Sequence, residues 1–244
     1  MDQIESNALE GDAVKALRLC VTLGGRSRSS ELRSWASQEL HGYEIDVELP
    51  DYRFISAPLC IDGTNFRWQI TGQQISPFQL PEFCREDISE TIELRHSLPA
   101  LVEMITSAAN NEDSLKLMPP QAATIVNYMN ATNQSSNNIH ALYWSVAAVS
   151  IKEVVERVCT IAVELASEMR AGMYEDQRIP SSDVASQAVE VVVHGDHNRI
   201  ELRDVQQTGT NTPRTGIGRK RIAEIVTASL GLVGALIYAL IRFF

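Results

Sequence analysis

Arginines that stand beside hydroxyl groups are the residues of this sequence best suited to bind a phosphorylated ligand. Arg26, Arg28 and Arg33 follow the pair Gly24-Gly25, and the serines between them add hydroxyl groups. A Gly/Ser/Arg loop that enters a helix can hold a phosphate through backbone N–H groups, the helix dipole and a guanidinium. The alternative is that these arginines only solvate the start of a helix.

A second set combines positive charge with aromatic rings. Arg53 and Arg67 stand next to Tyr52 and Trp68, and rings beside arginine are typical of surfaces that stack nucleic-acid bases. Arg53 has an alternative role in an ion pair with Asp51 or Glu39, and Trp35 is expected in the core. The predicted oligonucleotide site therefore comprises Arg26, Arg28, Arg33, Tyr52, Arg53, Arg67 and Trp68.

Catalytic chemistry has little support in this sequence. It contains no P-loop, no G-x-S-x-G and no H-E-x-x-H motif, which are the patterns that signal nucleotide hydrolysis, acyl transfer or zinc catalysis. His194, Asp196 and His197 resemble metal ligands, but the surrounding Gly-Asp-x-Asn favours a turn. We therefore predict a protein that is not an enzyme and has no metal and no cofactor.

The cysteines and the N-terminus indicate a reducing compartment. Cys20, Cys60, Cys84 and Cys159 are widely spaced and form no C-x-x-C pair, so reduced thiols in the core are expected. Met1 leads into polar residues rather than into an apolar signal sequence. We therefore expect the body of the protein in the cytoplasm.

Charge is distributed unevenly along the 244 residues. The chain is 44% hydrophobic and 21% charged with a net charge of −10, but its last 31 residues hold five basic residues and one acidic residue. The acidic body argues against a broadly basic nucleic-acid coat. An acidic body with a basic, apolar tail instead predicts a membrane protein.

The C-terminal tail carries the strongest signal. No residue of 225–241 is charged, and Arg219, Lys220 and Arg221 precede this run as a cytoplasmic flank does. Seventeen residues lie at the short end of the range that spans a bilayer, so a buried core helix is the alternative. We favour a single-pass inner-membrane anchor with lipid as its partner.

The run also carries a pattern for self-association. A stripe of small residues recurs every four positions and lets helices approach closely in lipid; it consists of Thr227, Gly231, Ala235 and Ala239. Glu224 lies one turn before it, either as a solvated interfacial carboxylate or as part of a ring at the mouth of an oligomeric pore. We therefore expect a homo-oligomer, while a simple anchor stays open.

The body must position these residues, and its pattern predicts mixed elements. Helices are expected over 8–24, ending at Gly24-Gly25, and over 30–42 with Ser29 or Ser30 as the cap. A hairpin is expected around Asp62-Gly63. Further helices are expected over 88–107 with a break at Pro99, over 122–129 and over 139–173, and a second hairpin over 188–206.

The longest predicted helix carries a short heptad seam of Ile151, Val154, Val158, Ile161 and Leu165. Packing within the subunit is the default explanation, and self-association is the alternative. A two-stranded hairpin is marginal alone, so the second hairpin is expected to form a collar between copies.

The stretch from Trp35 to Arg53 resembles the AbiTii family. It reads W-x-x-x-E-L-x-G-Y over 35–43 and then P-x-Y-R over 50–53, as that family's signature does. The resemblance implies an abortive-infection setting in which a phage-triggered effector stops host growth. More weakly, the chain is similar to the membrane effectors of Hailong-type defence, in which an oligonucleotide from a partner nucleotidyltransferase gates a channel.

The sequence thus predicts an α+β, mainly helical cytosolic domain with β-hairpins and one C-terminal transmembrane helix. The expected parts are an AbiTii-like domain over 1–178, a hairpin collar over 179–207, a linker and basic flank over 208–221, and the span over 222–244. The expected function is an oligomeric channel or membrane-disrupting complex gated by a cytosolic signal. The alternative is a tail-anchored module that recruits a toxin or partner enzyme and forms no pore.

Overall fold

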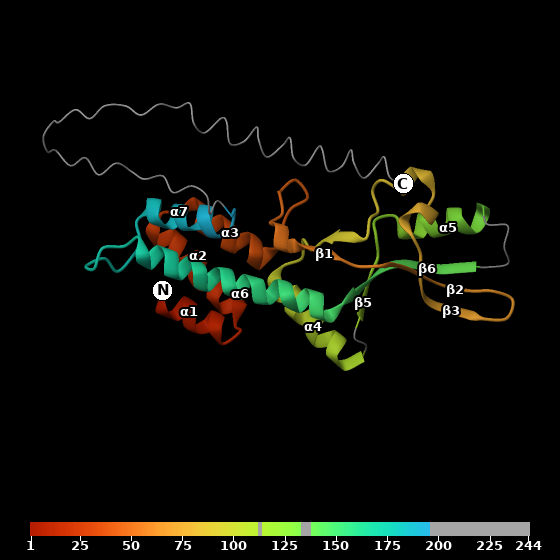
Figure 1. Cartoon of the computed structure of the whole chain (residues 1–244), viewed down its shortest axis with the longest axis horizontal. Helices are drawn as coiled ribbons and strands as arrows, with labels where there is room; N and C mark the ends of the chain where they lie inside the picture. Colours follow the sequence, from red (N-terminus) through yellow and green to blue (C-terminus); the bar gives the residue numbers. More distant parts are fainter. Residues whose placement is uncertain (112–113, 133–137, 196–244) are drawn as a thin grey trace, which may run out of the picture. The chain divides into compact units, whose positions relative to one another are not determined.

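The computed structural model describes residues 1–111, 114–132 and 138–195 (Figure 1). Within this part, most of the helices gather at one end, and a four-stranded sheet covered by one helix lies at the other (Figure 1). The helices are α1 (Asp2–Leu9), α2 (Ala13–Ser27), α3 (Ser30–His41), α4 (Leu98–Asn111), α5 (Ala122–Thr132), α6 (Ala148–Ala171) and α7 (Ser182–Val192). The predicted α+β, mainly helical class is confirmed for the described residues.

The strands form two antiparallel sheets. They are β1 (Phe54–Ser56), β2 (Leu59–Thr64), β3 (Gln69–Gln74), β4 (Thr91–Glu93), β5 (Ser114–Leu117) and β6 (Asn138–Ala147). The larger sheet has the order β3-β2-β6-β5, and β1 pairs with β4 in the smaller one. Short 3-10 turns are η1 (Asp51–Arg53), η2 (Pro77–Gln79) and η3 (Glu82–Cys84).

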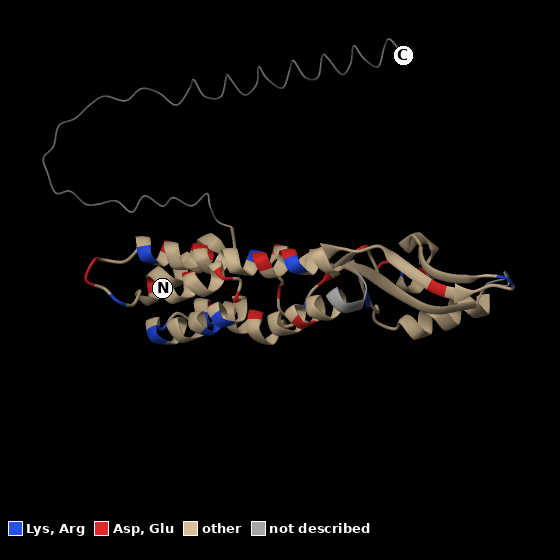
Figure 2. Cartoon of the chain, turned by 90° about the horizontal axis from the view of Figure 1, so that it is seen from below, with Lys and Arg blue, Asp and Glu red and all other residues tan. Residues whose placement is uncertain are grey.

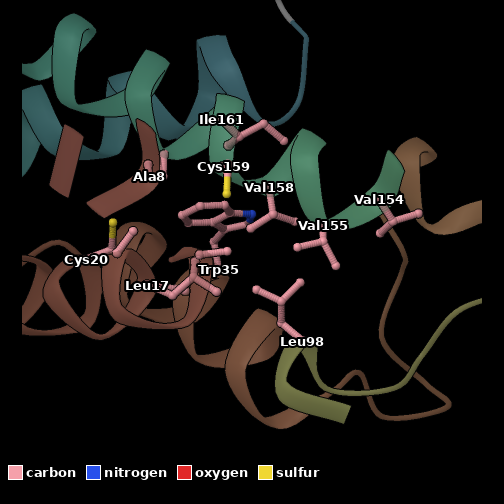
Figure 3. Packing of buried hydrophobic residues seen from close by; sticks show 14 of the residues in the cluster. Ala8, Leu17, Cys20, Trp35, Leu98, Val154, Val155, Val158, Cys159 and Ile161 are labelled. Atoms are coloured by element: carbon pink, nitrogen blue, oxygen red, sulfur yellow. The ribbon is translucent and has the colours of Figure 1, made fainter. Parts of the chain in front are cut away.

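Helix α6 is the centre of the helical core and contacts α1, α2, α4 and α7. Its heptad seam is buried against these neighbours, so packing within the chain, the default explanation, is confirmed. Trp35 of α3 lies among Val158, Cys159 and Leu98 in this core (Figure 3). The expected core role of Trp35 is confirmed.

A second hydrophobic cluster lies under the large sheet. It joins Leu59 and Ile61 of β2 with Leu142 of β6 and with Ile125 and Val126 of α5. Helix α5 therefore covers one face of the sheet. The expected helix over 122–129 is confirmed, with an end at Thr132.

All four cysteines are buried and unpaired, as the sequence predicts. Burial raises the pKa of the Cys20 thiol to about 12. A thiol with such a pKa is a poor nucleophile, because only the thiolate reacts readily. These cysteines therefore serve as small core side chains.

The expected single helix over 8–24 is wrong in both of its ends. Gly11 has φ +82, and Asp12 caps a new helix by accepting a hydrogen bond from the Lys15 N–H. Leu9, the last residue of α1, is exposed. Gly24-Gly25 does not stop α2, which continues to Ser27 and ends at Arg28 in the left-handed conformation. Ser29 and Gly42 bound α3 as predicted.

The expected turn at Asp62-Gly63 is also wrong. Both residues lie within β2, where the pairing with β3 and β6 shifts register. The chain instead turns at Asn65–Trp68, where the Asn65 N–H donates to the Trp68 carbonyl at 2.9 Å. The Asn65 side chain accepts from the N–H groups of Arg67 and Trp68, which is a favoured use of asparagine in turns.

Three predicted segments form another type of element than expected over part of their length. The segment before α4 forms β4, and Pro99 stands in the first turn of α4, where its missing N–H costs little. The first part of the expected long helix is strand β6. Residues 188–192 form the end of helix α7 rather than a strand. The expected second strand lies outside the described residues, and the collar between copies stays a prediction.

The membrane prediction falls on residues that the structure does not describe. Among the described residues, no helix is long and apolar enough to cross a membrane. The predicted span, its basic flank and the small-residue stripe all lie outside the described residues.

Candidate functional site

The residues of the Trp35–Arg53 motif meet in one buried polar network centred on Glu39. One oxygen of Glu39, Oε1, accepts hydrogen bonds from the hydroxyls of Tyr43 at 2.6 Å and Tyr52 at 2.8 Å. The other, Oε2, pairs with the guanidinium of Arg53, and both of these side chains are fully buried. The Trp35 indole N–H donates to the Tyr52 hydroxyl at 3.1 Å.

Arg53 extends the network to a distant part of the chain. Its Nη1 donates to the carbonyls of Leu94 at 3.0 Å and His96 at 2.8 Å, and its guanidinium lies 5.2 Å from the centre of the Tyr43 ring. Among the buried side-chain nitrogen and oxygen atoms of the described residues, Arg53 Nε is the one without a hydrogen-bond partner. The network thereby joins α3, η1 and the segment before α4.

Gly42 explains the spacing of the first half of the motif. It ends α3 with φ +94, and a Cβ atom there would lie 2.8 Å from the Arg95 carbonyl oxygen. The next residue, Tyr43, donates its N–H to that same oxygen at 2.9 Å. A glycine at this position therefore lets the chain turn so that Tyr43 reaches back to Glu39.

The network is built to hold shape rather than to transfer protons. Burial, followed by the nearby Glu39 carboxylate, raises the pKa of both Tyr43 and Tyr52 well above the usual tyrosine value. Both hydroxyls therefore remain protonated donors to Glu39 at physiological pH. Glu39 is fully buried and already holds a guanidinium and two permanent hydroxyl donors, so this carboxylate is closed off from a substrate.

A cleft of about 780 Å³ lies beside the network. Trp35, Tyr43 and Tyr52 contribute to its lining, together with other residues of α3 and the segment 47–52. The C-terminal end of α7 also lines it, with Val189, Val192 and Val193. Its volume is in the range of pockets that bind small molecules or short peptides, about 300–1,000 Å³.

The charge of the cleft is mainly negative. Its lining includes the carboxylates of Glu31, Glu48 and Asp51 against the single guanidinium of Arg157. A hydrogen bond from Ser186 at 2.6 Å is the main cause that lowers the pKa of Glu31. The cleft therefore suits a ligand with a cation and apolar groups, and it repels a polyanion.

The seven residues predicted to bind an oligonucleotide fall in three separate places. Arg26, Arg28 and Arg33 are exposed around the turn from α2 to α3. Tyr52 and Arg53 belong to the buried network, and the alternative pairing of Arg53 with Glu39 is confirmed. Arg67 and Trp68 lie at the turn of the β2–β3 hairpin, at the other end of the described part (Figure 1).

The predicted phosphate loop has an unfavourable neighbour. Ser29 caps α3 by accepting from the Leu32 N–H at 3.2 Å, and Glu31 lies in the first turn of the same helix. A carboxylate there already interacts with the helix dipole. An anionic ligand at Arg28 and Arg33 would have to approach this carboxylate.

No metal site is present among the described residues, where no group of three or more histidine, cysteine and acidic side chains could hold an ion. His194 lies at the cleft lining, while Asp196 and His197 fall outside the described residues. The cleft itself was not predicted from the sequence. It forms only because α7 packs beside α3, which lies far earlier in the chain, and no local pattern reports that contact.

Comparison with known families identifies the chain. The model of the AbiTii family matches residues 1–193, which covers most of the 244 residues. The chain therefore belongs to the AbiTii family, and membership supports a role in abortive-infection defence against phage. The resemblance carried by Trp35 to Arg53 is thus confirmed.

The other comparisons add nothing to this. No curated protein matches the chain, and no solved structure matches it. The further likeness to Hailong-type effectors has no support among these findings and stays a prediction.

Proposed function

We propose that the protein is an abortive-infection effector that acts on the membrane. The observation that carries this proposal is the joining of two parts in one chain. An AbiTii domain over 1–193 is followed by the uncharged run 225–241, which the basic flank Arg219, Lys220 and Arg221 precedes. In this proposal the domain lies in the cytoplasm and the run crosses the inner membrane as an anchor or as one wall of a pore.

The pore version requires several copies of the chain. One helix cannot enclose a pathway, so copies would pack along Thr227, Gly231, Ala235 and Ala239, with Glu224 at the cytoplasmic mouth. A cytosolic signal would bias two states of the AbiTii domain, and the domain would set the spacing of the spans.

Two parts of the domain differ in the kind of signal that they would bind. An oligonucleotide from a partner nucleotidyltransferase has its best support at Arg26, Arg28 and Arg33, which are exposed and pair with no described carboxylate. The acidic cleft opposes such a polyanion. A signal that enters the cleft would instead carry positive charge.

A second candidate function is recruitment without a pore. The observation that favours it is the cleft itself, whose carboxylates and valines suit a short cationic segment of another protein. In that case the tail only anchors the chain, and a recruited toxin or enzyme stops growth.

Growth curves of phage-infected cells distinguish the two. The full chain is compared with a variant in which residues 225–241 are replaced by an unrelated apolar helix of equal length. Loss of growth arrest with unchanged membrane localisation is the result expected for a pore. Arrest that survives this replacement but disappears when residues 222–244 are deleted would favour recruitment. Arrest that survives the deletion would contradict membrane action.

A further inference from the structure

The turn of the β2–β3 hairpin presents two large aromatic side chains to solvent. Phe66 is 93% exposed and Trp68 is 72% exposed, with Arg67 between them. The Asn65 side chain and the Asn65–Trp68 backbone hydrogen bond hold this turn in one conformation. A turn that is already ordered loses little conformational entropy when it binds.

The surroundings of the turn are almost free of charge. Arg67 is the one charged residue in 63–81, and the segment 117–139 has no Asp, Glu, Lys or Arg. In Figure 2 the helices carry most of the red and blue residues, and the sheet end carries few. Depletion of charge with exposed Trp, Phe and Arg is the composition of the centre of protein–protein interfaces.

The cleft beside the Glu39 network has the complementary properties. It offers the partly exposed apolar side chains of Val47 and Val193 and the carboxylates of Glu48 and Asp51. Neither of these two carboxylates pairs with another described residue. Its volume of about 780 Å³ gives room for a turn of three side chains.

We propose that the Phe66-Arg67-Trp68 turn of one copy inserts into the cleft of a second copy of this chain. Arg67 then lies against Glu48 and Asp51, and the two aromatic rings lie against Val47 and Val193. The two surfaces are different, so the contact is head-to-tail, and a series of such contacts closes into a ring or extends as a filament. A closed ring would gather the C-terminal runs of its members; this consequence rests on the proposed function, whereas the contact does not.

Charge favours a second copy over a lipid surface as the occupant. Arg67 is a single cation on a chain of net charge −10, which gives weak attraction to anionic lipid. The acidic cleft, in contrast, is present on every copy at the same concentration as the turn. Contact of the turn with a membrane is therefore the competing explanation that the experiment must exclude.

Cysteine cross-linking of the full chain in mild detergent tests the contact. One tagged copy carries Arg67→Cys, and a differently tagged copy carries Glu48→Cys. The four native cysteines are buried, so they give little background. We expect a disulfide between the two tags when the variants are mixed, and none when either variant is oxidised alone.

The matched control replaces the turn cysteine by Leu9→Cys, which is also highly exposed but lies on α1; it should not cross-link to Glu48→Cys. A charge exchange gives an independent measurement by sedimentation. Arg67→Glu should weaken association about 30-fold, as loss of a central interface residue does. A chain that carries both Arg67→Glu and Glu48→Arg should recover most of that loss.

Several results would overturn the proposal. A cross-link of Arg67→Cys with itself would show a turn-to-turn contact. The mixed cross-link could be absent while brominated lipid in vesicles quenches the tryptophan fluorescence of the unmodified chain and not that of the Trp68→Phe variant. This combination would assign the turn to a lipid surface. Absence of both would leave the turn without either partner and would also reject the contact. None of these measurements depends on conductance, so failure of the pore proposal is distinguishable from failure of this one.

Discussion

Glu39 and Arg53 form an ion pair in which both side chains are fully buried. Such a pair contributes little net stability compared with apolar residues, but it is costly to break, because one buried charge is then left without its partner. The surrounding hydroxyls and carbonyls satisfy most of the remaining donors and acceptors. The motif is therefore best understood as the fixed base on which the cleft is built.

The substitution Glu39→Gln tests this role. It keeps the shape of the side chain but leaves the Arg53 guanidinium buried without a counter-charge, so we expect a loss of about 3–5 kcal/mol in the free energy of unfolding. Urea denaturation monitored by circular dichroism measures it. The same change at Glu93, which pairs with Arg95 at the surface, should cost less than about 1 kcal/mol. Equal losses for the two variants would show that the buried pair has no special role.

The sequence predicted part of this arrangement. The core role of Trp35 and a pairing of Arg53 with Asp51 or Glu39 were among the expected alternatives, but the contact of Tyr52 with Glu39 was not expected. The sequence could not decide whether Arg53 binds a ligand or forms the ion pair. The burial of Arg53 depends on the carbonyls of Leu94 and His96, which lie about forty residues away in the chain. Local sequence does not report such contacts.

Elements with a capping signal were predicted well. Ser29 and Gly42 bound α3 as expected, because a serine N-cap and a glycine C-cap satisfy backbone groups that the helix leaves unpaired. The prediction failed where strand β6 passes into α6, since no proline or glycine marks that boundary and Ala147 gives no side-chain cap. It also failed at α7, where valines favoured a strand although Ala185, Ala188, Val189 and Val192 share a buried helical face.

The pair Gly24-Gly25 gives a sharp test of how α2 and α3 pack. A Cβ atom at Gly24 would lie 2.8 Å from the Arg33 backbone nitrogen, whereas one at Gly25 would meet nothing within 4 Å. Gly24→Ala should therefore destabilise the protein by about 1–3 kcal/mol through overpacking. Gly25→Ala should stabilise it by up to about 1 kcal/mol, because alanine favours a helix more than glycine does.

Thermal denaturation of the two single variants measures this difference. Opposite signs of the change in melting temperature are the expected result. A similar effect of both substitutions would contradict the close approach of the two helices at Gly24.

At the scale of the whole molecule, charge is the property that the sequence revealed best. The uneven distribution between the acidic body and the basic, apolar tail was evident from the residues alone. The meeting of α3 with α7, which creates the acidic cleft, was not evident, because it depends on the packing of α7 against both α6 and α3. The charge-poor sheet end was likewise recognisable only once β2, β3 and α5 were placed together.

In the pore version of the proposed function, the C-terminal run conducts ions when copies assemble. Ion flux from liposomes that contain the full-length protein tests it most directly, with Gly231→Ile compared against Leu232→Ile, a change in the same run that leaves the small-residue stripe intact. We expect flux for the unmodified chain and for Leu232→Ile and at least a tenfold loss for Gly231→Ile, since a bulky side chain prevents close helix approach. Absence of flux from inserted, oligomeric protein that has been stripped of bound nucleotide would contradict the claim and favour recruitment.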